Sequence, residues 1–383
     1  MKYPLFKVQV DSKKAQENLA AVLASGYLNE GEQVIQLEQE LSSFLSTKHL
    51  TLVNSCTSAI TLALRIIGVG VGDEVISTAM TCVATNTPII NSGATLVWAD
   101  IDLKTGMISV DDVEAKITER TRAIVIVDWA GAPADLKRFD ELSQKYDVPV
   151  IQDAAHAFGA KYMDFPISDF TDFTCLSFQA IKHFTTGDGG ALICRNQEDF
   201  ALAKKLKWFG YDRDTVKDSK GDWRGQKWDA DILPEEVGYK FNMNNVSAAI
   251  GLANLPNMPL ILEKHRSNAR ELASRLEGHP KVIILESDIR SLSSNWVFTL
   301  RLDVSEKNRD RIIENLNAIG IGAGLVHLPN NRYSAFTNSR QPLKNTDLFA
   351  SSQLSLPCGW WLDHDDIRII ATKLLFELDL IHD

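Results

Sequence analysis

The sequence predicts an α/β protein in which a mostly parallel sheet is covered by helices and is followed by a smaller α+β unit. Two observations support this fold class. Between about residues 48 and 210, short apolar runs rich in β-branched residues alternate with stretches of helical periodicity, which is typical of strands buried on both faces. After Pro256 the chain changes to a long amphipathic stretch and fewer apolar runs. The length of 383 residues suits two such units.

The elements of the first unit are expected in a regular alternation. We expect strands at 49–53, 74–77, 95–101, 123–128, 148–153, 173–178 and 190–194. Helices are expected at 57–67, 84–91, 110–117, 134–146 and 198–208. Parallel strands joined in this way have right-handed crossovers, and their sheets bind ligands beyond the carboxyl ends of the strands.

The second unit is expected to be smaller and less regular. Its predicted helices are 260–276, 307–319 and 365–378, and its predicted strands are 282–285 and 296–302. We therefore expect a large domain over residues 1–255, which includes the N-terminal segment, and a small domain over 256–383. No internal repeat or low-complexity segment is present in the sequence.

Composition narrows the class of protein. The formal charge is −10, with 40 basic and 50 acidic residues, which argues against nucleic acid as a partner. The five cysteines have no paired or metal-ligand spacing, so we expect reduced thiols, no metal site and a cytoplasmic location. The sequence contains no apolar stretch long enough for a signal peptide or a membrane span.

A polar segment over residues 211–236 interrupts the alternation of strands and helices. It contains several charges and two tryptophans, Trp223 and Trp228. A loop of this length in a compact protein is either functional or a disordered insertion. The sequence supports both interpretations equally.

Two segments place reactive side chains at the ends of expected strands. The strand 148–153 ends in Asp153 and continues to His156. This carboxylate either faces a ligand or, as is more common, caps the next helix. A second segment, from Phe178 to Gly190, carries Lys182 before three glycines. That lysine is either a desolvated amine suited to Schiff-base chemistry or an exposed side chain in a tight turn.

A third segment, Asn-Ser-Cys-Thr-Ser-Ala at 54–59, follows a strand and opens a helix. Its free backbone N–H groups favour an anion, although an ordinary Ser or Thr helix cap has the same sequence. An anion site, a buried acid and a nucleophilic amine are together the groups that a protein needs to bind pyridoxal 5'-phosphate (PLP). A Rossmann-type nucleotide enzyme is disfavoured because no GxGxxG follows the first strand.

Several motifs occur together in one order along the chain. They lie at 26–31, 72–76, 93–102, 131–135, 153–156, 177–190, 238–249 and 356–357. The most specific pair is Asp-Ala-Ala at 153–155 followed by Ser-Phe at 177–178, Lys182 and Gly-Asp-Gly-Gly at 187–190. In this order the chain resembles the DegT/StrS family of PLP-dependent nucleotide-sugar aminotransferases, which have the aspartate aminotransferase fold (fold type I). The resemblance implies a homodimer with active sites at the subunit interface.

The resemblance also implies roles for individual residues. Lys182 would hold PLP as a Schiff base, Asp153 would pair with the pyridine nitrogen, and His156 would lie beside the ring hydroxyl. The phosphate would be held around Cys56 and Thr57 with Ser177, and the ring would lie against residues 81–85, which include Cys82. The implied reaction moves an amino group from an amino acid, glutamate by resemblance, to a nucleotide-linked keto-sugar in two half-reactions, in amino-sugar, polysaccharide or lipopolysaccharide biosynthesis.

Four positions depart from the usual pattern of the family. Cys56 stands where glycine is usual, Cys82 where an aromatic residue is usual, and His156 where glutamine is commoner. The segment from Lys240 to Asn242 replaces a common Asn-Tyr-Arg, which in relatives reaches the cofactor phosphate of the neighbouring subunit. Lys240 would do so as a point charge.

Candidate substrate residues come from the motifs and from nearby cations. They are Tyr27, Asn29, His183, Arg213, Arg224, His327 and Asn330, with Lys227 and Arg332 as further partners for a diphosphate. Trp223 or Trp228 would stack on a base or form a local hydrophobic cluster. A lone histidine such as His327 is more often structural.

Two other classes of protein remain open at this point. One branch of the family replaces the Schiff-base lysine with histidine and acts as a PLP- or PMP-dependent sugar dehydratase. This chain retains Lys182 with His183 beside it, which favours transamination. The other class is a non-catalytic regulatory relative, and the presence of both Lys182 and Asp153 argues against it.

Overall fold

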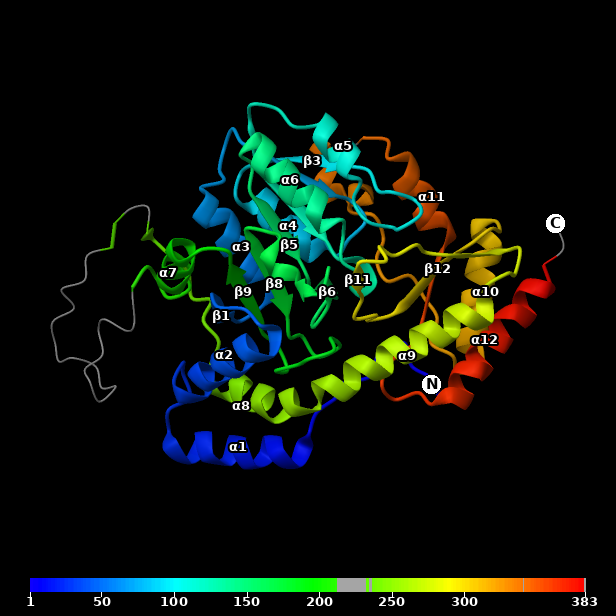
Figure 1. Ribbon diagram of the computed structural model, residues 1–383, viewed down its shortest axis with the longest axis horizontal. Coiled ribbons are helices and arrows are strands. Elements are labelled where there is room, and N and C mark those ends of the chain that lie inside the picture. Colours follow the sequence, from blue (N-terminus) through cyan, green and yellow to red (C-terminus); the bar gives the residue numbers. More distant parts are fainter. Residues whose placement is uncertain (212–231, 234–235, 340, 382–383) are drawn as a thin grey trace.

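A seven-stranded sheet forms the centre of the protein, whose computed structural model describes residues 1–211, 232–233, 236–339 and 341–381 (Figure 1). The strand order is β1-β9-β8-β5-β4-β2-β3. The strands are β1 (Leu50–Val53), β2 (Glu74–Thr78), β3 (Thr95–Ala99), β4 (Thr121–Val127), β5 (Val150–Asp153), β8 (Phe173–Ser177) and β9 (Gly190–Cys194). All neighbouring pairs are parallel except those made by β9, which is antiparallel to β1 and β8. The predicted α/β fold with a mostly parallel sheet is confirmed.

Two apolar cores cover the two faces of this sheet. Along β4, Ile124 and Ile126 belong to one core and Ala123 and Val125 to the other, because successive side chains of a strand point to opposite faces. The helices around the sheet are α1 (Ser12–Ser25), α2 (Glu32–Leu45), α3 (Cys56–Ile67), α4 (Val83–Asn91), α5 (Val110–Ala115), α6 (Leu136–Tyr146), α7 (Gln197–Leu206) and α8 (Asn245–Asn254). In Figure 1, α1, α2 and α8 lie together below the sheet.

The C-terminal part has an antiparallel sheet of its own, in the order β10-β12-β13. Its elements are α9 (Met258–Leu276), β10 (Val282–Ile284), β12 (Phe298–Leu302), α10 (Glu306–Ala318), α11 (Lys344–Ser352), β13 (Gln353–Leu356) and α12 (His364–Asp379). A further small sheet joins β6 (Lys161–Tyr162), β7 (Phe165–Pro166) and β11 (Ser291–Leu292). Short 3-10 helices lie at Trp129–Gly131, Ile167–Asp169, Leu255–Asn257, Asn330–Arg332 and Ser334–Ser339.

The two parts of the chain are joined by α9 and by the N-terminal segment. Leu262 near the start of α9 packs into a core of the large sheet, whereas Leu272 and Leu276 near its end pack into the C-terminal core. Tyr3 also belongs to the C-terminal core. A domain division after residue 255 stays our proposal, and these contacts place residues from both sides of it in shared cores.

The expected strands and helices are all present, with ends shifted by at most two residues, and eight further α-helices and strands among the described residues were not expected. These eight are α1, α2, α8, α11, β6, β7, β11 and β13. Helix α1 buries only Ala15 and Val22, which with the half-buried Leu19 form a narrow apolar stripe. The strand expected from residue 296 begins at Phe298, because the backbone N–H of Trp296 donates to the Ala130 carbonyl oxygen instead of to a strand. Among the described residues, no helix has the length and apolar character needed to cross a membrane.

Candidate active site

A cavity of about 400 Å³ opens at the edge of the large sheet where β5 and β8 end. It also receives the N-termini of α3 and α4 and one wall from the C-terminal part. The lining includes eight of the predicted site residues, namely Cys56, Thr57, Cys82, Asp153, His156, Ser177, Lys182 and His327. Its position beyond the carboxyl ends of parallel strands is the usual one for ligand sites in such folds.

Asp153 is the last residue of β5 and is almost completely buried, with 5% of its surface exposed. One carboxylate oxygen accepts a hydrogen bond from Thr85 Oγ1 at 2.6 Å, and the other accepts from the Ala155 N–H at 3.1 Å. Cys56 Sγ also lies 3.7 Å from that second oxygen. No helix begins directly after β5, so Asp153 is not a helix cap. The carboxylate is held by donors and faces the cavity.

Lys182 lies in the turn that follows β8, where its N–H donates to the Gln179 carbonyl oxygen at 2.9 Å. Its side chain lines the cavity and is not an exposed turn residue. Burial lowers the pKa of the Lys182 amine to about 8, against the opposing effects of Asp153, Cys56 and Cys82. A substantial fraction of the amine is therefore neutral near pH 8, as a nucleophilic lysine requires.

The N-terminus of α3 forms the anion-binding end of the cavity. Ser55 caps the helix by accepting a hydrogen bond from the Ser58 N–H at 3.1 Å, while Cys56 and Thr57 line the cavity. The helix cap and the ligand-facing N-terminus thus occur together. Gly190 permits this arrangement, because a Cβ atom there would lie 2.7 Å from the backbone nitrogen of Cys56. The partial positive charge of the helix end favours a phosphate.

Two imidazoles and one indole also line the cavity, namely those of His156, His327 and Trp296. His156 stacks on Trp296 with centroids 4.1 Å apart and lies 5.5 Å from the parallel ring of His327. Trp129 packs edge-on against both histidines. Burial lowers the pKa of His156 well below its usual value and that of His327 to about 4. Both rings are therefore neutral at neutral pH.

Each of these two imidazoles has a buried nitrogen that the protein does not satisfy. His156 Nδ1 and His327 Nε2 have no hydrogen-bond partner within the described residues. A buried polar atom without a partner is costly unless a ligand or water completes it. This wall is therefore suited to a ligand that carries polar substituents.

Two predicted substrate residues, Asn330 and His183, are buried next to the cavity without lining it. Asn330 is fully buried, and its side chain donates to the Thr81 carbonyl oxygen at 2.7 Å and accepts from Asn86 Nδ2 at 2.9 Å. His183 is buried, and its Nε2 donates to the Ser294 carbonyl oxygen at 3.0 Å. We therefore propose both as positioning residues behind the cavity wall, in place of direct contact with substrate.

Three other predicted residues gather at the N-terminus of α8, away from the cavity. Asn242 Nδ2 donates to Asn29 Oδ1 at 3.2 Å, and Lys240 Nζ contacts Asn242 Oδ1 and lies 4.3 Å from the Trp208 ring centroid. The carbonyl oxygen of Tyr27 accepts from Asn245 Nδ2. Arg332 is exposed, 3.5 Å from Asp347. Arg213, Arg224, Lys227, Trp223 and Trp228 lie outside the described residues.

Sequence reasoning did not single out several residues of the site. Trp296, Gln179 and Asp188 line the cavity. Thr85, in the stretch 81–85 that was expected against the ring, donates a hydrogen bond to Asp153, which the sequence did not predict. Trp296 is more than 100 residues from Lys182 in the chain, and no local motif marks it. Only tertiary packing brings such residues to the site.

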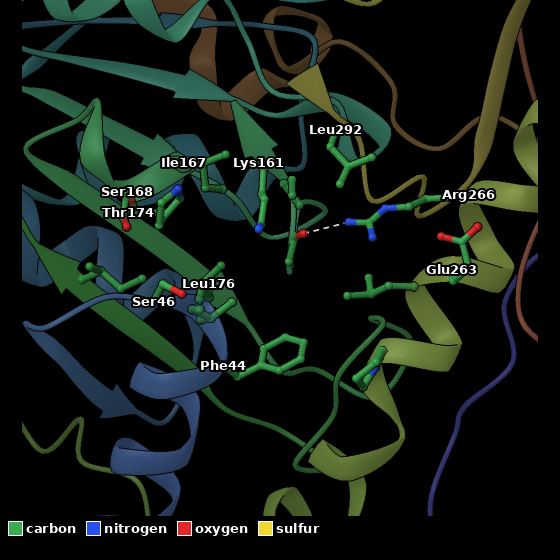
Figure 2. Close-up of a pocket in the computed structure, with 18 residues that line it drawn as sticks. Phe44, Ser46, Lys161, Ile167, Ser168, Thr174, Leu176, Glu263, Arg266 and Leu292 are labelled. Atoms are coloured by element: carbon green, nitrogen blue, oxygen red, sulfur yellow. Dashed lines mark hydrogen bonds between the residues drawn. The ribbon is translucent and has the colours of Figure 1, made fainter. Parts of the chain in front are cut away.

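A second cavity of about 330 Å³ lies between the end of α2, β6 and α9, and contains none of the predicted site residues (Figure 2). Arg266 reaches into it from α9, as Figure 2 shows, and donates to the carbonyl oxygens of Gly159 at 2.8 Å and Ser293 at 2.9 Å. These bonds tie α9 to the loop before β6 and to the residue that follows β11. Of these two cavities, only the first contains predicted site residues.

The first cavity fits PLP. It offers a helix N-terminus for the phosphate, a buried carboxylate, a cavity-facing amine and unsatisfied imidazole nitrogens. Together with the mostly parallel sheet, these features define a PLP-dependent transferase of fold type I.

Comparison with known proteins agrees with this class. The model of the DegT/DnrJ/EryC1/StrS aminotransferase family matches residues 9–375, and the chain belongs to that family. The crystal structure of AtS13 from Actinomadura melliaura has 35% identity and a TM-score of 0.89, over 97% of this chain and 98% of that chain. The PLP form of the putative sugar aminotransferase Spr1654 from Streptococcus pneumoniae has 26% identity and a TM-score of 0.89, covering 100% of both chains.

A curated relative is similar over the same length. The UDP-4-amino-4-deoxy-L-arabinose–oxoglutarate aminotransferase of Shewanella sediminis is 31% identical, over an alignment that covers 96% of each chain. The protein is a PLP-dependent sugar aminotransferase, and the predictions of family, fold class, cofactor and enzyme class are confirmed.

Proposed function

We propose that this enzyme transfers the amino group of L-glutamate to a nucleotide-linked keto-sugar, with Lys182 as the residue that binds PLP covalently. The observation that carries the proposal is the convergence of Lys182, Asp153 and the N-terminus of α3 on one cavity. PLP, when bound, supplies the aldehyde for attachment and a ring that accepts electrons.

The residues of the chain have separate tasks in this proposal. The Lys182 amine, with a pKa of about 8, can act as a nucleophile and then carry a proton between two carbon atoms. Asp153, fixed by Thr85 and the Ala155 N–H, can keep a ring nitrogen protonated through a charge-assisted hydrogen bond. The N-terminus of α3 with Ser177 can bind the phosphate.

The two neutral imidazoles are suited to orienting the ligands. His156 Nδ1 and His327 Nε2 are both available for hydrogen bonds to hydroxyl or carbonyl groups. Because both rings pack against Trp129, their planes are fixed before a ligand arrives. Such preorganisation reduces the entropy that is lost on binding.

The substrate class is inferred from the relatives. The name of the Shewanella relative contains a UDP-linked amino sugar and oxoglutarate, and oxoglutarate is the keto acid left by glutamate. We extend this to a nucleotide-linked keto-sugar and a glutamate donor here. A role in cell-surface polysaccharide or lipopolysaccharide synthesis belongs to the same proposal.

A homodimer with shared active sites is also part of the proposal. Lys240, Asn29 and Tyr27 lie together outside the cavity of their own chain, so in this arrangement they can contact a cofactor only in a second copy. Mixing Lys182→Ala protein with Lys240→Ala protein tests this. We expect hybrid dimers of the two inactive variants to regain activity. If activity does not recover after the subunits have exchanged, Lys240 does not act on the cofactor of the neighbouring subunit. We also propose a cytoplasmic location, which is supported by five unpaired cysteines.

The central experiment is borohydride reduction of the purified protein followed by peptide mass spectrometry. We expect a reduced adduct on Lys182 and none in Lys182→Ala. Addition of glutamate should convert the aldehyde form of the cofactor to the amine form, seen as a change in its absorption band. Conversion of keto-sugar nucleotides is then followed by mass. Loss of water from the sugar without gain of nitrogen would show a dehydratase.

A further inference from the structure

Trp296 contacts the proposed cofactor lysine in two ways. The Lys182 amine lies 3.8 Å from the centroid of the Trp296 ring. The indole N–H donates to the carbonyl oxygen of Ile181 at 2.9 Å, which is the residue that precedes the lysine. One side chain therefore contacts both the reactive amine and the backbone that carries it.

The position of Trp296 is fixed from several directions. Its ring stacks against His156 at 4.1 Å and against Phe6 at 4.7 Å, with interplanar angles of 21° and 23°. Its backbone N–H donates to the Ala130 carbonyl oxygen at 2.8 Å, and the side chain is only 3% exposed. The neighbouring Ser294 donates from its hydroxyl to the His156 carbonyl oxygen at 2.9 Å.

The N-terminal segment supports this arrangement. Phe6 is held near the ring because the Tyr3 N–H donates to the Gly320 carbonyl oxygen at 2.8 Å and the Gly322 N–H donates to the Tyr3 carbonyl oxygen at 2.7 Å. Phe6, Trp296 and His156 thus form a row of stacked rings that runs from the N-terminal segment into the cavity.

Few of the groups around the Lys182 amine stabilise it as a cation, and Asp153 has the largest effect among them. The ionisable groups that line the cavity with it are Asp153 from β5, Cys56 from α3, Cys82 before α4, Asp188 before β9, and the rings of His156 and His327; His183 lies behind the wall. Burial of the amine lowers the pKa of Lys182 by more than Asp153, Cys56 and Cys82 together raise it. The indole face is a neutral group that attracts a cation directly.

We propose that Trp296 is a positioning residue for the catalytic lysine, and that its indole face is the resting place of the Lys182 ammonium whenever the amine is not bonded to the cofactor. The proposal rests on the proposed role of Lys182 in binding PLP. The released amine must stay close to the reacting carbons, because it takes a proton from one carbon and, as the ammonium, delivers it to the other. The ring face favours the protonated form, and the bond to Ile181 fixes the turn.

The test measures Lys182 directly in cofactor-free protein. Competitive labelling with acetic anhydride over a pH series, read by peptide mass spectrometry with exposed Lys13 as internal standard, gives the pKa of the amine. The comparison is between Trp296→Phe, which retains an aromatic face, and Trp296→Leu, which does not. Trp361→Leu is the matched control, since Trp361 packs in the C-terminal core and does not line the cavity.

We expect Trp296→Leu to lower the pKa of Lys182 by roughly half a pH unit relative to Trp296→Phe, which follows from the usual strength of a cation–π contact. Trp296→Phe should stay close to the parent, and Trp361→Leu should leave the value unchanged. In the loaded enzyme, the pH profile of kcat should move in the same direction. If Trp296→Leu does not fold, Trp296→Met replaces it as the variant without a ring.

The outcomes separate this inference from the proposed function. Equal pKa values in the Phe and aliphatic variants, or a rise in the aliphatic one, would overturn the role of the ring. Absence of a borohydride-reduced adduct on Lys182 in the parent protein would instead overturn the assignment of the lysine itself.

Discussion

Replacement of Asn330 by alanine distinguishes a positioning role from a substrate-binding one. The Asn330 side chain makes two buried hydrogen bonds, to the Thr81 carbonyl oxygen and from Asn86 Nδ2. Asn86 keeps its second bond to the Thr78 carbonyl oxygen. After the substitution, the Thr81 carbonyl therefore loses its side-chain donor while Asn86 stays partly satisfied.

The magnitude follows from these contacts. An unsatisfied buried carbonyl costs about 1–3 kcal/mol, and loss of the second bond about 1 kcal/mol more, so the free energy of unfolding should fall by roughly 2–4 kcal/mol. Because Thr81 and Cys82 line the cavity, the affinity for PLP should also fall. Urea denaturation and a fluorescence titration with PLP measure the two effects.

The control is Arg332→Ala in the same segment, which removes only an exposed ion pair with Asp347. It should change the free energy of unfolding by less than about 1 kcal/mol. A raised KM for the sugar in Asn330→Ala, with unfolding and PLP affinity both unchanged, would refute the positioning role and support the contact with substrate that the sequence first suggested.

Three further substitutions have defined outcomes. The pKa of Lys182 is lowered on folding, so its charge destabilises the cofactor-free protein below pH 8, and this effect is lost as the pH rises towards 10. Lys182→Met should therefore stabilise the cofactor-free protein by roughly 1–3 kcal/mol at pH 7 and by less at pH 10. Destabilisation by Lys182→Met at pH 7 would contradict this. The buried amine of Lys207 lies 2.8 Å from Glu30, so Lys207→Met should lower the free energy of unfolding by about 3–5 kcal/mol. Equal urea midpoints for Lys207→Met and the parent protein would contradict this. Gly190→Ala should displace the N-terminus of α3 and weaken PLP binding about tenfold or more by titration, and an unchanged affinity would show that the close approach to Cys56 is not needed.

The site residues that could be predicted from the sequence are those that lie within short motifs. The end of β5, the turn after β8 and the start of α3 each carry their reactive residue within a short motif, and the sheet brings the three together because the ends of its strands meet at one edge. The Ser55 helix cap and the ligand-facing N-terminus, which stood as alternatives in the sequence, are both present because they use different groups of the same helix end.

The remainder of the site depends on contacts between distant segments. Trp296 and Phe6 approach Lys182 only after the C-terminal part and the N-terminal segment have packed. His183 and Asn330 have side chains that suit a ligand site, but packing turns both away from the cavity to bond with backbone carbonyls. Helix α1 was missed because its narrow apolar stripe, with only two buried residues, gives a weak periodic signal.

Helix α9 limits how the enzyme can open. Its 19 residues form a rod of about 28 Å, with one end embedded beside the large sheet and the other in the C-terminal core. The helix has proline only in its first turn and no glycine, so it offers no interior hinge. A swinging motion of the C-terminal part would have to break one of two cores, and we expect a sugar nucleotide to enter through local loop displacement.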